Sequence, residues 1–316
     1  MNHRAASWLA WSLCGLVLIL IACAVALAVA NRSNVWGLTF LLPVPSAALV
    51  GALIASRQPR NPVGWFILGH AFCFSLGEFG RQYAIYGIRT EPGSLPFARA
   101  LLWPTYWIWY PGLILMISVL PLYFPNGRLV SRGWRWVTRL VVVFAVCATG
   151  LAMVQPGDSE ATSIPNPLGI ESLSDGAGAL SFVFGLVLPA GWLFLGAVAV
   201  ASLIVRFRRS HGEERQQLAW FVYAVVLFLL VNTVERFSTE LLPSSVRDFL
   251  FVFTLECLWV AIGIAILRYR LYDIDILINR TLVYGSLTAM LLAVYFGGVA
   301  TIQVLLGVLT GQEEQP

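Results

Sequence analysis

FLFVFTLECLWVAIGIAIL (249–267) followed by RYRLYDIDILINRTLVYG (268–285) is the stretch that decides the fold. The first part is an apolar run interrupted by one acid, Glu256, and a second apolar run, 282–309, follows the charged and aromatic segment. A helix needs about 20 apolar residues to cross ~30 Å of hydrocarbon at ~1.5 Å per residue. We therefore expect two membrane-spanning helices, joined by a segment that lies at a membrane surface.

The composition of the whole chain agrees with this expectation. Of its 316 residues, 59% are hydrophobic and 11% are charged, whereas soluble domains carry about 25% charged residues. The apolar runs are continuous rather than alternating, which excludes a membrane β-barrel. The fold class is predicted as all-α: a polytopic integral membrane bundle of about nine helices, spanning 8–30, 36–55, 63–86, 107–124, 136–154, 180–205, 217–234, 249–267 and 282–309.

The arginines predict the orientation of this bundle. All 20 basic side chains are arginine, and an N-terminus on the cytoplasmic side places fourteen of them in inner segments. Eleven of the 16 acids then lie outside. This distribution follows the positive-inside rule. We expect a multi-pass protein of the inner (plasma) membrane with a cytoplasmic N-terminus, forming one transmembrane domain over residues 1–316.

Four short motifs, placed by this topology on the inner side, add a resemblance. RNPVGW (60–65), FPNGRL (124–129), ERQQLAW (214–220) and RYRLYDIDILINRTLVYG (268–285) occur in this order. Together they resemble the membrane-spanning N-terminal region of multi-pass bacterial sensor histidine kinases. The resemblance implies a further span after residue 309 and a cytoplasmic output region. The chain is therefore expected to be truncated before its output domain, through which alone a response regulator would be a partner.

The chain itself is predicted not to be an enzyme. It has no stretch that resembles a phosphoacceptor helix or an ATP-binding box, and it has no lysine for a P-loop or kinase site. His211 lies in an arginine-rich loop, and we interpret it as a solvated side chain. No cysteine pair has C-x-x-C spacing, so no metal site, cofactor or disulfide framework is predicted.

Ionisable residues inside spans are candidate sensing residues, because placing a charge there costs about 2.5–3.5 kcal/mol on insertion scales. His70 is expected roughly 10 Å from the inner surface in the third span, and Glu256 roughly 16 Å in the eighth. A contact between these two residues is a testable hypothesis.

Four further candidates are expected in the outer half of the membrane. Glu78 and Arg81 are three residues apart on one helix, so they can pair locally. Glu235 and Arg236, at the end of the seventh span, are expected at a similar level. These residues either form a polar ligand site or are structural pairs that neutralise each other, and we favour the structural pairs.

The inner-face segment 268–285 supplies candidate relay residues: Arg268, Arg270, Asp273, Asp275 and Arg280. The alternative is a salt-bridged cap at the start of the ninth span. Membrane lipids and a second copy of the chain are the expected partners, and nucleic acid is not.

The favoured function is a membrane-embedded sensory and signal-transduction module, in which a signal shifts helix packing between two arrangements. The alternative is a stand-alone transporter or channel. Against it, the sequence shows no inverted hydropathy repeat and no matched pair of broken helices.

Overall fold

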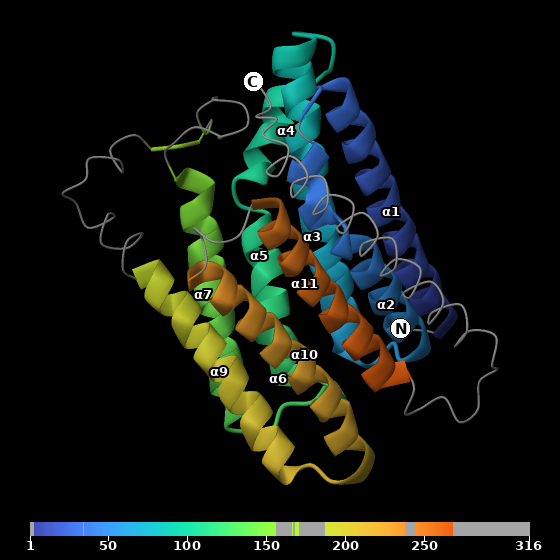
Figure 1. Ribbon diagram of the computed structural model, residues 1–316, viewed down its shortest axis with the longest axis vertical. Helices are drawn as coiled ribbons and strands as arrows, with labels where there is room; N and C mark the ends of the chain where they lie inside the picture. The colour runs from blue at the N-terminus through green and yellow to red at the C-terminus, as the bar shows by residue number, and fades with distance from the viewer. Residues whose placement is uncertain are drawn as a thin grey trace, which may run out of the picture. The chain divides into compact units, whose positions relative to one another are not determined.

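A computed structural model of the chain describes residues 3–33, 35–155, 166, 168–170, 187–237 and 244–267. All regular structure in these residues is helical, and eight helical segments are long and apolar enough to cross a membrane (Figure 1). This confirms the all-α fold class. Each of the first eight predicted spans corresponds to one of these segments, whereas the ninth, 282–309, lies outside the described residues. The segments are His3–Ala30, Leu38–Arg57, Pro62–Thr90, Ala98–Tyr123, Trp134–Val154, Ala190–Arg209, Gly212–Val231 and Val246–Leu267.

The chain divides into two compact units, Met1–Leu218 and Ala219–Pro316, and each is described by itself. The division falls inside helix α10 (Gly212–Phe237). The prediction of a single transmembrane domain over residues 1–316 stays a prediction.

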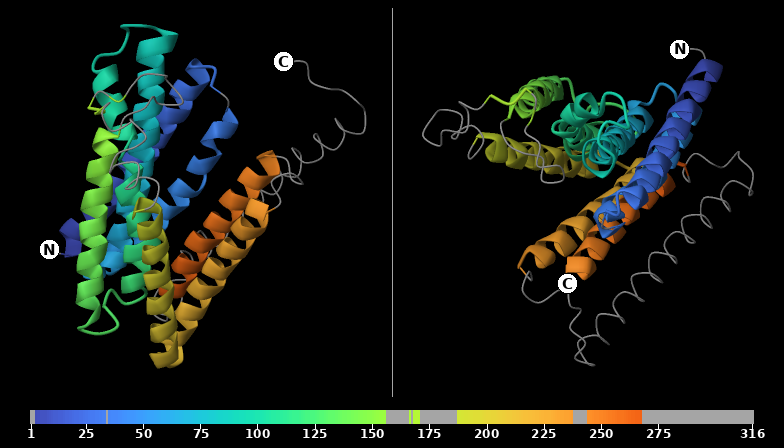
Figure 2. Two further views of the ribbon diagram at one scale, coloured as in Figure 1. Left: turned by 90° about the vertical axis from the view of Figure 1, so that its left-hand side faces the viewer. Right: turned by 90° about the horizontal axis from the view of Figure 1, so that it is seen from above.

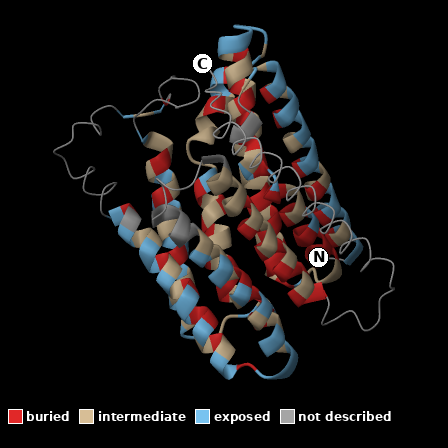
Figure 3. Ribbon diagram, in the orientation of Figure 1, coloured by how far each residue is buried: buried red, intermediate tan, exposed pale blue. Residues whose placement is uncertain are grey.

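The first unit begins with three helices, α1 (His3–Ala30), α2 (Pro43–Arg57) and α3 (Pro62–Ile85), which pack side by side (Figure 1). The buried residues of α1 are mostly small, and its large apolar residues are exposed. Figure 3 shows exposed residues along much of this helix. Small residues let helix backbones approach closely, which is how membrane helices pack without a hydrophobic driving force. The buried residues of α1 recur mainly at helical spacing: Ala6, Ala10, Cys14, Val17, Ala24 and Ala28.

One glycine shows how close α2 and α3 come. A Cβ atom added at Gly64 would lie 2.5 Å from the backbone nitrogen of Ala55 and 2.8 Å from the carbonyl oxygen of Gly51. Both neighbours are backbone atoms, which cannot rotate away. A larger residue at position 64 would therefore push the two helices apart.

The fourth span is a broken helix. It consists of α4 (Ala98–Thr105), α5 (Trp109–Ile114), the π-helix η3 (Leu115–Val119) and α6 (Leu120–Tyr123). Proline removes a backbone N–H and clashes with the preceding turn. The interruptions accordingly lie beside prolines: the turn after α4 follows Pro104, and η3 lies between Pro111 and Pro121.

The predicted spans 63–86 and 107–124 leave residues 87–106 as their connection. This connection is wrong at both ends, because helical structure continues to Thr90 and resumes at Ala98. The breakers Pro92, Gly93 and Pro96 all precede Ala98, and the next residues, ARALLW, are mostly strong helix formers. Helix α4 therefore begins at Ala98, and Pro104 lies in its last turn, where the helix is already ending. The fourth span begins nine residues before its predicted start at residue 107.

Helices α7 (Trp134–Val154) and α9 (Leu188–Arg209) complete the first unit (Figure 2). They pack on the broken span through a cluster formed by Ile114, Leu122, Val141 and Leu195. The predicted sixth span, 180–205, is observed as Ala190–Arg209, and residues 180–186 lie outside the described part.

Two buried serines lie in this region, Ser118 on η3 and Ser202 on α9. The elements η3 and α9 pack together. Neither side chain is exposed to solvent. Among the described residues neither hydroxyl has a hydrogen-bond partner. A buried hydroxyl without a partner costs free energy of folding, so each serine is a local weak point in the packing.

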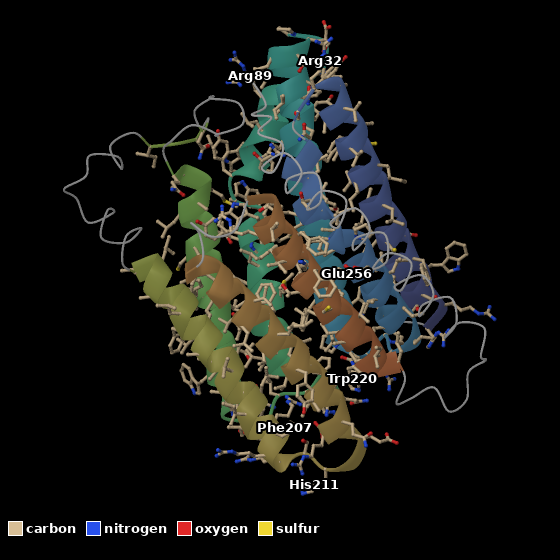
Figure 4. All side chains as sticks on the ribbon, viewed as in Figure 1. Arg32, Arg89, Phe207, His211, Trp220 and Glu256 are labelled. Atoms are coloured by element: carbon tan, nitrogen blue, oxygen red, sulfur yellow. The ribbon has the colours of Figure 1, made fainter. Side chains whose placement is uncertain are left out.

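The second unit contains most of α10 and helix α11 (Ser244–Leu267). The two helices meet through the rings of Phe228 and Phe251, whose centroids are 5.7 Å apart and whose planes are inclined at 62°. Glu256 lies near the middle of α11 (Figure 4).

Candidate functional site

Three loops of the first unit meet at one end of its helices. They connect α2 to α3, α6 to α7, and α9 to α10. The first two carry residues of the motifs RNPVGW and FPNGRL, and the third leads into ERQQLAW at the start of α10. Phe207 and His211 mark this end in Figure 4, and Arg32 and Arg89 mark the opposite end. We name the group of residues that joins the loops the loop cluster; it consists of Asn61, Asn126, Gly127, Arg206 and Glu214.

Asn61 connects the first loop to the second. Its side-chain oxygen Oδ1 accepts a hydrogen bond from the backbone N–H of Val63 at 3.1 Å, which caps the N-terminus of α3. Its Nδ2 donates to the carbonyl oxygen of Pro125 at 2.9 Å. The side chain is buried. An asparagine suits this position because one side chain must accept in one loop and donate to another.

Gly127 gives the second loop its shape. Its φ of +74° lies in the left-handed region, which residues with a Cβ atom adopt at a cost. A Cβ atom here would also lie 2.5 Å from Cδ of Pro62 and 2.7 Å from Oδ1 of Asn61. Glycine is therefore required both by the backbone conformation and by the contact with the RNPVGW loop.

Arg206 holds the second loop against the end of α9. The residue is only 6% exposed. Its Nη2 donates to the carbonyl oxygen of Leu122 at 3.0 Å and to that of Arg128, and its Nη1 donates to Oδ1 of Asn126 at 3.1 Å. A guanidinium suits the site because its planar donors point in several fixed directions. The bond to Leu122 satisfies a carbonyl group at the C-terminal end of α6, where a cation is also favourable for the helix dipole.

Glu214 adds the first turn of α10 to the loop cluster. Its Oε1 accepts a hydrogen bond from Nδ2 of Asn126 at 3.1 Å and lies 3.7 Å from Nη1 of Arg206. The Glu214 side chain is 38% exposed, and such a pair contributes little stability because water screens it. Its role in the cluster is therefore to orient Asn126 and Arg206 more than to stabilise the fold.

The predicted local pair of Glu78 and Arg81 is present at the opposite end of α3. The guanidinium contacts both carboxylate oxygens, with Nε to Oε2 at 2.9 Å. Nε2 of Gln82 donates to Oε1 of Glu78 at 2.9 Å, and Nδ2 of Asn31 donates to Oε1 of Gln82 at 3.1 Å. The pair thus belongs to a polar network that joins the turn after α1 to α3.

His70 is buried on α3 and faces the broken span. Its Nδ1 lies 2.9 Å from the carbonyl oxygen of Gly112 on α5. Because a carbonyl only accepts, Nδ1 carries the proton in this contact. The contact therefore ties α3 to the segment just before the π-helix η3.

The other predicted site residues are placed only in part. Glu256 lies on α11 in the second unit, so its predicted contact with His70 in the first unit stays a prediction. Glu235 and Arg236 lie on α10, but their side chains are outside the described set. The five proposed relay residues lie outside the described part of the chain: Arg268, Arg270, Asp273, Asp275 and Arg280.

The loop cluster could not be recognised as a site from the sequence. Arg206 was one of many arginines assigned to the inner side. Asn61, Asn126 and Glu214 belonged to three separate motifs, with no indication that they meet. The ordered motifs were the available signal.

Within the described residues, no group of three or more His, Cys, Asp or Glu side chains could hold a metal ion. Comparison of the chain with models of protein families, with curated proteins and with solved structures finds no match.

Proposed function

We propose that this chain is the membrane-embedded sensory part of a signal-transduction protein of the sensor histidine kinase type. In this proposal it has about nine spans and a cytoplasmic N-terminus, and it lies in the inner membrane. It conveys a change in helix packing to an output region. Kinase activity belongs to that output region and not to this chain.

The observation that carries the proposal is the loop cluster. Three motifs that are far apart in the sequence contribute side chains to one hydrogen-bonded group, through the 2.9 Å bond from Asn61 to Pro125 and the 3.1 Å bonds that Asn126 makes with Arg206 and Glu214. A relay needs such a group, because loops that are bonded together respond together when one helix pair moves.

The distribution of charge in the first unit supports the proposed orientation. The loops that meet at the loop cluster are rich in arginine. At the opposite end, Asn31 binds Gln82, and the indole of Trp103 donates to the carbonyl oxygen of Met153. Consecutive helices thus alternate in direction. The positive-inside rule then favours a cytoplasmic location for the end with the loop cluster.

The broken span supplies an element that could take two arrangements. π-Helices are rare and often occur at functional positions. η3 lies between two proline-containing segments, and the bond from His70 to Gly112 fixes its approach to α3. In the proposed mechanism, a signal changes the packing of this segment, and α6 carries the change to the loop that Arg206 holds.

The broken span also favours a second candidate function, a transporter or channel. Transporters of known architecture place interrupted helices around a central site, and these occur as a matched pair in two structural repeats. In the described residues, the span Ala98–Tyr123 is broken in this way. A transport function predicts a matching interrupted helix elsewhere in the chain.

The two functions are distinguished by a deletion strain complemented with the wild type or with Asn126→Ala. The sensory function predicts that deletion alters transcription at a defined set of promoters. The wild type restores transcription, and Asn126→Ala fails to restore it at an equal amount of protein in the membrane, because the substitution breaks the bonds to Arg206 and Glu214.

Asn166→Ala is the matched control. Asn166 also donates to backbone carbonyls, those of Met153 and Gln155, but it does so at the opposite end of α7. The control should restore transcription. Full restoration by Asn126→Ala would contradict a relay through the loop cluster, and a deletion that changes only solute accumulation would favour transport.

A further inference from the structure

Three exposed arginines form a stripe at the start of α7, close to the end of the unit that holds the loop cluster. Arg132 lies in the turn before the helix, and Arg135 and Arg139 lie in its first two turns. The spacing of four residues places Arg135 and Arg139 on one face of the helix. The guanidinium of Arg139 lies over the ring of Trp136, 5.2 Å from its centroid. We call these four residues the arginine stripe.

Among the described residues, no acid forms an ion pair with the arginine stripe. Helix α7 contains no Asp or Glu. Within the described residues, the ion pairs are Arg81 with Glu78 and Arg206 with Glu214, and neither includes a residue of the stripe. Like charges one helical turn apart repel each other. A bound anion would therefore stabilise this face.

The face that carries the arginines continues as an apolar surface. The next exposed side chains along it are Leu140, Val143 and Val146, which are 50%, 58% and 68% exposed. In a helix long and apolar enough to span a membrane, such a surface suits contact with hydrocarbon. The arginine stripe thus lies where an apolar helix face reaches the headgroup layer, and Trp136 is 67% exposed at the same level.

We infer that the arginine stripe binds the phosphate of an anionic phospholipid, such as phosphatidylglycerol. Guanidinium groups bind phosphate oxygens through paired donors, and basic residues next to a membrane helix attract anionic lipids. A lipid suits this surface better than an acidic protein does, because the apolar surface beside the arginines matches acyl chains. This inference does not depend on the proposed sensory function.

The test measures lipid binding to the purified full chain by native mass spectrometry, with phosphatidylglycerol and phosphatidylcholine compared. The wild type should retain phosphatidylglycerol preferentially. Replacing all three arginines of the stripe with glutamine should weaken that binding between about tenfold and about a hundredfold. The matched control replaces three exposed arginines at the opposite end of the unit, and it should leave the preference unchanged: Arg32, Arg89 and Arg99.

Size-exclusion chromatography verifies that each variant is folded. If the triple variant is not folded, the Arg135→Gln/Arg139→Gln double variant replaces it, with an expected loss of about tenfold. Equal losses in the stripe and control variants would show a general effect of surface charge and overturn the inference. So would the absence of headgroup preference in the wild type, or equal competition by soluble glycerol phosphate, which would indicate a site for free anions.

Discussion

Replacing Arg206 with methionine tests the loop cluster most directly. The substitution keeps an apolar stem of similar length and removes the donors to Leu122, Asn126 and Arg128. Hydrogen bonds from a charged group contribute about 1.5–3 kcal/mol each, and a buried carbonyl left without a donor costs about 1–3 kcal/mol. Leu122 is fully buried, whereas Asn126 is exposed and can bind water instead.

The loss is partly offset, because the variant no longer buries a cation at 6% exposure. We therefore expect Arg206→Met to lower the free energy of unfolding by about 2–4 kcal/mol. Arg206→Lys should recover less than half of this loss, since an ammonium keeps the charge but lacks the planar array of donors.

The measurement is unfolding by sodium dodecyl sulfate in mixed micelles, followed by far-ultraviolet circular dichroism. Arg209→Met is the control, because Arg209 is exposed in the same last turn of α9. It should change the free energy of unfolding by less than about 0.5 kcal/mol. Equal effects of the two substitutions would refute the assignment of Arg206 as the residue that holds the loops.

Three further predictions concern packing and intramembrane charge. Gly64→Ala should lower the free energy of unfolding by about 2 kcal/mol or more, since its Cβ would meet backbone of α2, whereas Gly150→Ala, with open space around it, should be neutral or slightly stabilising. Ser202→Ala should be neutral or stabilising by about 1 kcal/mol, because it removes a buried hydroxyl without a partner in the described structure; a clear loss in the same unfolding assay would reveal a bound partner. Glu256→Gln, in the middle of a span, should change that free energy more than Glu213→Gln at an exposed helix start, and equal effects would count against a special role for Glu256.

The positions of the first eight spans could be predicted because hydrocarbon imposes one strong requirement on sequence, about 20 apolar residues in a row. The same rule misplaced the start of the fourth span. The breakers Pro92, Gly93 and Pro96 indicated a loop, but all three precede the helix, which begins at Ala98. A rule based on local sequence cannot determine the first residue of a helix that is itself interrupted.

The candidate site was less predictable, because it depends on contacts between distant segments. The pairing of Glu78 with Arg81 follows from spacing on one helix and was predicted. The bonds of Arg206 join residues about 80 positions apart in the sequence. Nothing in the sequence near Arg206 distinguishes it from the exposed Arg208 and Arg209, since only the folded loops bring acceptors to one of them.

Asn61 has a consequence for the order in which the protein is assembled. Its Oδ1 is engaged by Val63, two residues later, so α3 can begin as soon as α2 and its loop have been synthesised. Its Nδ2 also donates to Oε1 of Gln58 in the same loop, whereas its second bond requires the carbonyl oxygen of Pro125, which is synthesised 64 residues later. The α2–α3 hairpin can thus fold and enter the membrane before one N–H of the Asn61 side chain has met its acceptor. The later loop docks on a surface that is already shaped to receive it, and an error in that docking leaves the earlier helices intact.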